Sequence, residues 1–530
     1  MARKPINFKT TVVENREHRL GTITSWDGSA SELAELSNYS LGDGSCSSKG
    51  RACQFCEQNS PFVQGSSCSE SMVLCQLGYV RGAALVQHSP VGCAVSQAGL
   101  NTGFKLGLKR HYTIENEEYM MATSNLEESD MVFGGADKLR QAVTDVFERV
   151  HPKIIFISSS CATAIIGDDI DGVADELQEQ LGIPVIPTHC EGFRSKHWTT
   201  GFDASQHAIL RQIVQKPKKK QEDLVNVVHL FGSDVFTPMF KELNLRPNFA
   251  VDFGTVEGLQ QLSEAACTVG FCYTLSSYLG AGLEQEFGVP EVHAPQPYGI
   301  EGTSAWLREI GRLTNREELV EKYIAKEIKR ITPKIKEFKK KLKGVNGFVS
   351  TGSAYAHAIV EVLRELDIQV DGTLVFHHDP IYDSQDPRQD TLAHVINTTG
   401  DIPFFSVGNR QQFQFYQLLK RVNPDFIAVR HGGLASLASY VGVPALSLGD
   451  ESRAIGFQGI LNLGELIIET LARKRFSNDI AAHVKLPYTQ WWLDQTDPYI
   501  LAKNPGLIYE DDEDTIPVEV GRVPVQLEAM

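Results

Sequence analysis

The residues of this chain most suited to chemistry are its ten cysteines. Cys161 follows an apolar run that ends Ile155-Phe-Ile-Ser-Ser-Ser, and a helix is expected to open on Gly167-Asp168-Asp169 a few residues later. Parallel α/β sheets bind their ligands at the carboxyl ends of their strands. A thiol at such a strand end is therefore a candidate site residue rather than core filler.

Two more thiols stand in separate loops. Cys68 begins Cys-Ser-Glu-Ser-Met-Val-Leu-Cys75, and Cys93 ends His88-Ser-Pro-Val-Gly-Cys93. With Cys161 they offer three thiolates from three loops, which suits an iron–sulfur cluster because its irons need soft anionic ligands. Spacing alone leaves buried, inert thiols as an equal alternative, since free cysteine is also a common core residue.

A third group of thiols lies near the N-terminus, where Cys46, Cys53 and Cys56 form Cys-x6-Cys-x2-Cys. A CxxC pair offers two thiolates at chelating distance, and Cys68, a partner residue or an exogenous ligand would complete an extra iron–sulfur or zinc site. The alternative is a set of free or redox-active thiols on an N-terminal arm.

Composition sets the class of protein in which these thiols act. The 530 residues predict two to four domains, at roughly 100–200 residues per domain. A hydrophobic fraction of 42% and a charged fraction of 22% fit a soluble globular protein, and no apolar run reaches membrane-spanning length. The N-terminus lacks the apolar core of a secretory signal, so we expect a cytoplasmic protein whose cysteines serve metals better than disulfides. A net charge of -16 argues against nucleic acid and leaves room for a protein partner.

The elements that must position the thiols follow an α/β pattern. Apolar runs alternate with helix-like stretches, which predicts parallel sheets covered by helices. The basic run from Lys216 and a long charged helix over 315–343 divide the chain into three Rossmann-like subdomains with extended arms at both ends. There is no GxGxxG and no Walker-type loop, so we expect no ATP site in this chain. The predicted strands are 153–158, 224–231, 266–272, 347–352, 369–376 and 426–430, and the predicted divisions are 1–59, 60–220, 221–343, 344–480 and 481–530.

Four sequence blocks resemble the α subunit of nitrogenase component 1 and its relatives. The blocks are His88–Cys93, Ser124–Leu139, Cys161–Asp169 and Cys190–Arg194. They occur in the family's order with similar gaps, and a looser likeness runs from residue 60 to residue 480. The resemblance implies the family's fold, with metal clusters held between the subdomains.

The resemblance also implies a P-cluster, which is an 8Fe-7S electron relay shared with a β subunit. In the family, one cysteine from each of the first three loops is a ligand, and here those positions are Cys68, Cys93 and Cys161, all in subdomain 60–220. Cys75 and Cys190 fall outside the ligand positions and would be structural thiols.

A catalytic cluster is the second metal group that the resemblance implies, attached to Cys272 in subdomain 221–343. Gly270-Phe-Cys272-Tyr273 resembles the Val-His-Cys-Tyr pattern of the family's cysteine ligand, and Cys267 matches less well. The family's histidine ligand falls near Gly449. We therefore expect no molybdenum or vanadium, because that imidazole holds the heterometal.

Homocitrate, the organic acid of that cluster, is also not expected. The family's glutamine aligns with Trp198, its pocket histidine with Phe202, and two arginines with Asn101 and Ala354. A buried tricarboxylate needs several cationic or bidentate partners, which these positions do not supply. An all-iron cluster of the 8Fe-9S-C type remains compatible. The candidates for its second contact are His357, His377, His378 and His431, and His357 is assigned here to cofactor binding. For each of them we expect hydrogen bonding to sulfide or a structural role rather than iron ligation.

Within the superfamily, the chain looks most like the nitrogenase-like reductases that cleave methylthio-alkanes to a small hydrocarbon and a thiol. His377-His378-Asp379-Pro380 and the block that begins at Arg430 carry this likeness. Trp198 and Phe202 would line the pocket with apolar surface, which suits a thioether better than dinitrogen. Trp198 is thus a candidate catalytic residue. His197 and His378 are candidate proton relays, since imidazole titrates near neutrality, with a structural role as the alternative for each.

The same resemblance implies partners for this chain. A homologous β subunit would complete an α2β2 heterotetramer, and a homodimeric, ATP-hydrolysing Fe protein with a 4Fe-4S cluster would deliver electrons to the P-cluster and on to the cluster near Cys272. Two other hypotheses stay open. One is a dinitrogen-reducing enzyme with an altered pocket, and the other is a noncatalytic scaffold for cofactor assembly.

Overall fold

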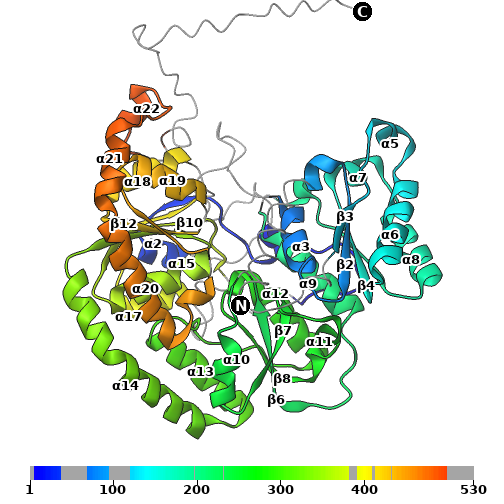
Figure 1. Ribbon diagram of the computed structural model, residues 1–530, viewed down its shortest axis with the longest axis horizontal. Coiled ribbons are helices and arrows are strands. Elements are labelled where there is room, and N and C mark those ends of the chain that lie inside the picture. The colour runs from blue at the N-terminus through cyan, green and yellow to red at the C-terminus, as the bar shows by residue number, and fades with distance from the viewer. Residues whose placement is uncertain are drawn as a thin grey trace, which may run out of the picture.

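Three parallel sheets covered by helices form the framework of the chain (Figure 1). The computed structural model describes residues 5–36, 68–94, 120–195, 197–230, 232–380, 391–408, 412–430, 432–449, 451–497 and 500. Within these residues every paired strand of the three sheets is parallel to its neighbour except β1, which pairs antiparallel to β11. The predicted α/β class with three Rossmann-like subdomains is confirmed, while the predicted division points stay predictions.

The first subdomain contains a four-stranded sheet in the order β3-β2-β4-β5. Every residue of the two central strands is buried, and a strand buried on both faces has a continuous apolar sequence, as Ile154-Ile-Phe-Ile does. The strands are β2 (Ala83–His88), β3 (Met120–Thr123), β4 (Ile154–Ser159) and β5 (Val185–Thr188); the helices are α3 (Ser69–Leu77), α5 (Glu128–Phe133), α6 (Ala136–Val150), α7 (Cys161–Ile166), α8 (Ile170–Leu181) and α9 (Thr200–Gln212), with a 3-10 turn at Gly192–Arg194.

The second subdomain contains a three-stranded sheet in the order β7-β6-β8. Its last helix is the long charged helix that the sequence predicts. The charges of this helix face solvent while an apolar stripe, including Ile324, Ile331 and Phe338, is buried against neighbouring helices. The strands are β6 (Gln221–His229), β7 (Arg246–Val251) and β8 (Ala265–Gly270); the helices are α10 (Phe236–Glu242), α11 (Val256–Gln260), α12 (Tyr273–Phe287), α13 (Glu301–Thr314) and α14 (Glu317–Leu342), with a 3-10 turn at Leu262–Glu264.

The third subdomain contains a six-stranded sheet in the order β1-β11-β10-β9-β12-β13. None of the described helices, here or in the other subdomains, is long and apolar enough to cross a bilayer. The strands are β9 (Asn346–Thr351), β10 (Gln369–Val375), β11 (Phe404–Val407), β12 (Phe426–Val429) and β13 (Ala445–Ser447); the helices are α15 (Ser353–Glu365), α17 (Thr391–Thr399), α18 (Gln412–Val422), α19 (Gly432–Tyr440), α20 (Gly456–Ala472), α21 (Lys474–His483) and α22 (Gln490–Asp494), with a 3-10 turn at Glu451–Ala454.

The N-terminal segment, residues 5–36, touches all three subdomains. Val12 forms a bridge to His189 after β5, the backbone of Ile6 pairs with the Gln285 side chain of α12, and β1 (Trp26–Gly28) adds an edge strand to the third sheet. Two short helices, α1 (Arg16–Arg19) and α2 (Ala30–Leu36), complete the segment. The segment that the sequence predicts as an arm is thus, over its described residues, part of the folded body.

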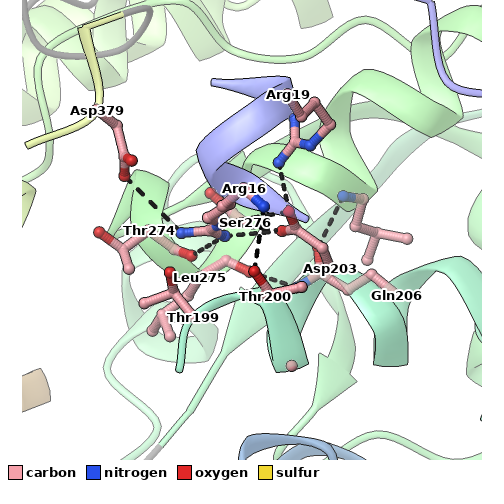
Figure 2. Close-up of polar contacts among 12 residues, drawn as sticks. Arg16, Arg19, Thr199, Thr200, Asp203, Gln206, Thr274, Leu275, Ser276 and Asp379 are labelled. Carbon is pink, nitrogen blue, oxygen red and sulfur yellow. Dashed lines mark hydrogen bonds and ion pairs between the residues drawn. The ribbon is translucent and has the colours of Figure 1, made fainter. Parts of the chain in front are cut away.

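A buried ion-pair network fastens α1 to the other subdomains (Figure 2). Arg16 donates to Asp203 of α9 at 2.8 Å and to the Thr274 carbonyl of α12 at 2.6 Å, and lies 3.8 Å from Asp379 beyond β10. Arg19 pairs with the second oxygen of Asp203 at 2.6 Å. The side chains of Arg16 and Asp203 are both fully buried, so the two charges depend on one another for solvation.

Asp203→Asn tests this network. The change leaves two arginines without their shared carboxylate, and removing one partner of a buried ion pair costs about 3–5 kcal/mol. We expect the free energy of unfolding, measured by urea denaturation followed by circular dichroism, to fall by that amount. The matched control is Asp223→Asn, because Asp223 pairs with Arg246 at 2.7 Å where both side chains are about half exposed; its cost should stay below about 1 kcal/mol. Equal effects of the two changes would contradict the role assigned to the network.

Candidate functional site

The three predicted cluster thiols come from loops at one edge of the first sheet. β2, β4 and β5 are neighbours and parallel, so the loops that follow them emerge together at their carboxyl ends. Cys93 follows β2, Cys161 follows β4 as the first residue of α7, and Gly192 follows β5. Cys68 joins them from the start of α3, where it is the N-cap residue. The position of Cys161 is fixed locally by a capping box, in which Ser160 and Thr163 begin α7 immediately after the strand.

Gly192 lies beside two of the three thiols, Cys68 and Cys161. A Cβ at Gly192 would lie 2.5 Å from the Cys68 sulfur and 3.5 Å from the Cys161 sulfur, so these two thiols face each other across a glycine that leaves room for them. Burial raises the pKa of Cys93, and the charges of Glu70, Cys68 and Cys161 raise it further, so Cys93 lies near the same group. Cys68 and Cys93 are exposed and Cys161 is half-buried, so the group opens onto the protein surface.

A buried carboxyl group lies behind the three thiols. Glu70 of α3 accepts hydrogen bonds from Gln87 at 2.9 Å and from Ser158 at 3.4 Å. Burial raises the pKa of Glu70 to about 8, and raises the pKa of Cys68, to which Glu70 adds a smaller electrostatic contribution. Burial thus disfavours the thiolate forms of Cys68 and Cys93 unless a cationic centre joins them, and metal binding supplies that centre while releasing protons.

The donor set fits a polynuclear cluster. Among the described residues, no group of three or more His, Cys, Asp or Glu side chains is arranged around a single metal ion. Thiolates on three separate loops instead supply soft ligands spread over a wider centre. Cys75, Cys190 and Cys267 are buried in the core, and burial raises the pKa of Cys75 and of Cys267 to about 12, which suits structural thiols.

Cys272 lies at a second, buried position. It follows β8 and is the N-cap residue of α12, and only 5% of its surface is exposed. Burial raises the pKa of its thiol, which forms a hydrogen bond with Thr274 in the first turn of α12. A single soft ligand at the start of a helix is compatible with the attachment of an iron–sulfur cluster.

Aromatic side chains from two other subdomains surround the start of α12. The His197 ring lies 4.7 Å from the His377 ring and 5.7 Å from the Trp198 ring, and Trp198 lies 5.6 Å from Phe202. Nε2 of His377 is 3.4 Å from Oγ1 of Thr274, which connects this group to Cys272. All these side chains are buried. The structure thus brings His197, Trp198 and His377 together beside the predicted ligand.

The other predicted histidines, His378 and His357, have different surroundings. His378 is buried next to His377, and burial lowers the pKa of His378 to about 3. His357 of α15 hydrogen-bonds Thr391 at 2.7 Å and packs against Phe405 of β11, inside the third subdomain. The assignment of His357 to cofactor binding stays a prediction. Five residues named from the sequence lie outside the described residues: Cys46, Cys53, Cys56, Asn101 and His431.

Sequence reasoning missed several residues of the two sites. Glu70 leaves one signal, since it is the only charged residue of α3. Thr274 lies two residues after Cys272, where a hydroxyl in a first helical turn is ordinary. Gly192 leaves no signal, because its close contacts with two thiols depend on the fold. Arg16 leaves none either, because its partner Asp203 is 187 positions away in the sequence.

Comparison with known proteins agrees with this geometry. Residues 68–472 match the nitrogenase component 1 type oxidoreductases. The chain belongs to this family. It is 26% identical over 430 residues to the nitrogenase iron-molybdenum cofactor biosynthesis protein NifE of Methanococcus maripaludis, over 78% of this chain and 85% of that protein. It is 28% identical over 303 residues to the nitrogenase molybdenum-iron protein alpha chain of Methanosarcina barkeri, over 55% of this chain and 56% of that protein.

A solved structure carries the same fold. Nitrogenase Cp1 at pH 5 superimposes with a TM-score of 0.66 at 21% identity, covering 81% of this chain and 92% of that one. The family resemblance inferred from the four sequence blocks is therefore confirmed. The relatives of this nitrogenase-like oxidoreductase include both cofactor-assembly proteins and α chains, so they do not choose between the functions left open by the sequence.

Gly192→Ala tests the convergence of the thiols. The added methyl group would meet the Cys68 sulfur at 2.5 Å, so we expect the variant to lose most of the iron bound at Cys68, Cys93 and Cys161, with an unchanged melting temperature. Iron analysis and electron paramagnetic resonance (EPR) would measure the loss. Gly92→Ala is the matched control, because a methyl group there meets no described atom within 4 Å. Full iron content in Gly192→Ala would refute the convergence.

Proposed function

We propose that this chain is the catalytic α subunit of a nitrogenase-like reductase that cleaves the C–S bond of methylthio-alkanes. The observation that carries the proposal is the environment of Cys272. Trp198 and Phe202 supply buried aromatic surface at the two positions that align with a glutamine and a histidine of the family. A small thioether is an apolar molecule with a soft sulfur, and an apolar pocket beside an iron site suits it.

The proposed cofactors follow from the two thiol sites. Cys68, Cys93 and Cys161 would hold one half of a P-cluster, and Cys272 an all-iron cluster without molybdenum, vanadium or homocitrate. When bound, these groups would supply one-electron transfer and an iron that binds the substrate sulfur. The chain's own residues would hold the clusters through thiolates, exclude water with Trp198 and Phe202, and orient polar side chains near the start of α12.

A partner subunit would complete the surface site, since three thiolates supply only part of the ligands of a large cluster. The rim of this site is apolar: Phe193 follows Gly192, Val91 lies two residues before Cys93, and Ile165 lies one turn after Cys161. Val132 and Phe133 extend the patch on α5, which packs against α7. These side chains are between 52% and 87% exposed. An exposed apolar patch of this kind marks a protein interface, and we assign it to a homologous β subunit. Electrons would come from a separate ATP-hydrolysing Fe protein.

Ile165→Glu tests the interface. A carboxylate buried without a partner in an apolar interface costs several kcal/mol, so we expect at least about a 100-fold loss of affinity for the coexpressed β subunit. Size-exclusion chromatography with light scattering would show a monomeric chain in place of the heterotetramer. Phe476→Glu is the control, because Phe476 of α21 is 67% exposed but belongs to the third subdomain. A heterotetramer of normal stability in Ile165→Glu would refute the assignment.

Turnover of the reconstituted complex tests the proposed reaction. With its Fe protein and ATP, the complex should convert dimethyl sulfide to methane and methanethiol, which gas chromatography measures. Cys272→Ala should abolish both products and keep the iron of the surface site, whereas Cys161→Ala should lose that iron and block electron delivery. Molybdenum or vanadium at stoichiometric level would contradict the all-iron assignment.

The second candidate is a scaffold for cofactor assembly, and the similarity to NifE over most of the chain favours it. A complex that accepts electrons but releases no thiol or hydrocarbon from any methylthio-alkane would support the scaffold and contradict the reductase. Reduction of dinitrogen to ammonia by the complex would instead support the third hypothesis, an altered nitrogenase.

A further inference from the structure

Each ring nitrogen of His377 lies near a polar group: Nδ1 near Asp379 and Nε2 near Thr274. Nδ1 lies 3.0 Å from a carboxylate oxygen of Asp379, so the two side chains form an ion pair when the ring is protonated. Nε2 faces the other way, 3.4 Å from Oγ1 of Thr274 and 4.0 Å from the point that a Cβ at Gly352 would occupy. Thr274 in turn hydrogen-bonds the Cys272 thiol. The second ring nitrogen is thus directed toward the place where α12 and α15 begin.

Asp379 is held as an ionised acceptor for this ring. Thr22 donates to its other oxygen at 2.5 Å, and Arg16 lies 3.8 Å away while also bound to Asp203 and to the Thr274 carbonyl (Figure 2). Burial alone would raise the pKa of Asp379, but the charge and hydrogen bond of His377 and the charge of Arg16 lower it strongly overall. Asp379 therefore presents a negative charge to the His377 ring.

The remaining groups around His377 carry no charge at neutral pH. Burial, and then the charge of His377, lower the pKa of His197 well below its usual value, and burial lowers that of His378 to about 3. Trp198 contributes an apolar edge 6.5 Å from the His377 ring. His197 and His378, which the sequence suggested as proton relays, are therefore poor proton donors, whereas His377 has both an ionised partner and a nitrogen facing Thr274.

We propose that His377 is the residue that donates a proton to the substrate at the Cys272 site, with Asp379 and Arg16 as its positioning residues. This inference rests on the proposed C–S reductase function. Cleavage of dimethyl sulfide breaks one C–S bond and consumes two electrons from the Fe protein and two protons, giving methane and methanethiol. Nε2–H of His377 gives one proton to the departing carbon, and the methanethiolate takes the other from solvent after it leaves the site. The neutral ring keeps its Nδ1–H facing Asp379 until solvent protonates Nε2 again between turnovers.

His377→Gln in the complete complex is the first test. Gln keeps a polar side chain but cannot act as an acid near neutral pH, and general acid catalysis contributes roughly 100-fold or more. We expect kcat for methane release to fall about 100-fold with KM little changed. His394→Gln is the matched control, because His394 also pairs with a carboxylate, Glu361 at 3.1 Å, but is partly exposed on α17; its kcat should stay within about twofold of wild type. Wild-type kcat in His377→Gln would overturn the inference.

Asp379→Asn tests the positioning role. The amide of the new side chain would still face Nδ1 but would remove the negative charge that pairs with the ring, so we expect a loss of kcat smaller than that of His377→Gln, again with little change in KM. Iron content and melting temperature of each variant would show whether the fold is retained. A folded Asp379→Asn complex with wild-type kcat would refute the positioning role.

A spectroscopic readout separates this inference from the proposed function. Pulsed EPR of the reduced complex in D2O, with 15N-labelled histidine, should detect an exchangeable deuteron and a nitrogen coupled to the cluster in wild type and His394→Gln, and neither coupling in His377→Gln. If both couplings persist in His377→Gln, the inference fails whatever the substrate. If wild type releases no thiol but the couplings depend on His377, the C–S function fails while the placement of His377 at the site is supported.

Discussion

The buried guanidinium of Arg16 is the constraint on which the arrangement of the second site depends. A fully buried charge is stable only when opposite charges and hydrogen-bond acceptors surround it. Its partners are Asp203, the Thr274 carbonyl and Asp379, and each comes from a different subdomain. They meet only when the three subdomains hold one relative position, so the network penalises any displacement that would separate the start of α12 from the loop after β10. The N-terminal segment thereby fixes the geometry around Cys272 from a distance along the chain.

The two thiol sites of this nitrogenase-like chain differ in the number of ionisable groups that they bring together and in how deeply they are buried. At the surface site, burial is the main cause that disfavours the ionised forms of Cys68, Cys93 and Glu70. Such a group is satisfied by a multivalent cationic centre shared with a partner. At the second site, a single thiol is buried among aromatic rings, with an ion pair nearby. The first environment suits electron exchange across an interface, and the second suits chemistry from which water is excluded.

The fold was largely predictable because its central strands are buried on both faces. The runs predicted at 153–158, 347–352 and 369–376 appear as β4, β9 and β10 with ends shifted by one residue at most. β1 escaped prediction because three residues, Trp26–Gly28, are too short to show a pattern, and their strand exists only through pairing with β11. The contacts of the N-terminal segment are unpredictable for the same reason, because they are long-range and none of them leaves a local signal.

The candidate sites were predictable in part, and their polar partners much less so. Cysteines at strand ends carry a local signal, whereas the distinction between His377 and His378 does not. Adjacent residues in extended backbone point to opposite faces, so the choice depends on which face the site occupies. The backbone of His378 pairs with Ile23 of the N-terminal segment. This pairing fixes which way the side chains alternate, so that His377 points toward Thr274. The arrangement of His377 and Asp379 thus depends on a segment more than 350 residues away in sequence, which the local sequence around His377 does not reveal.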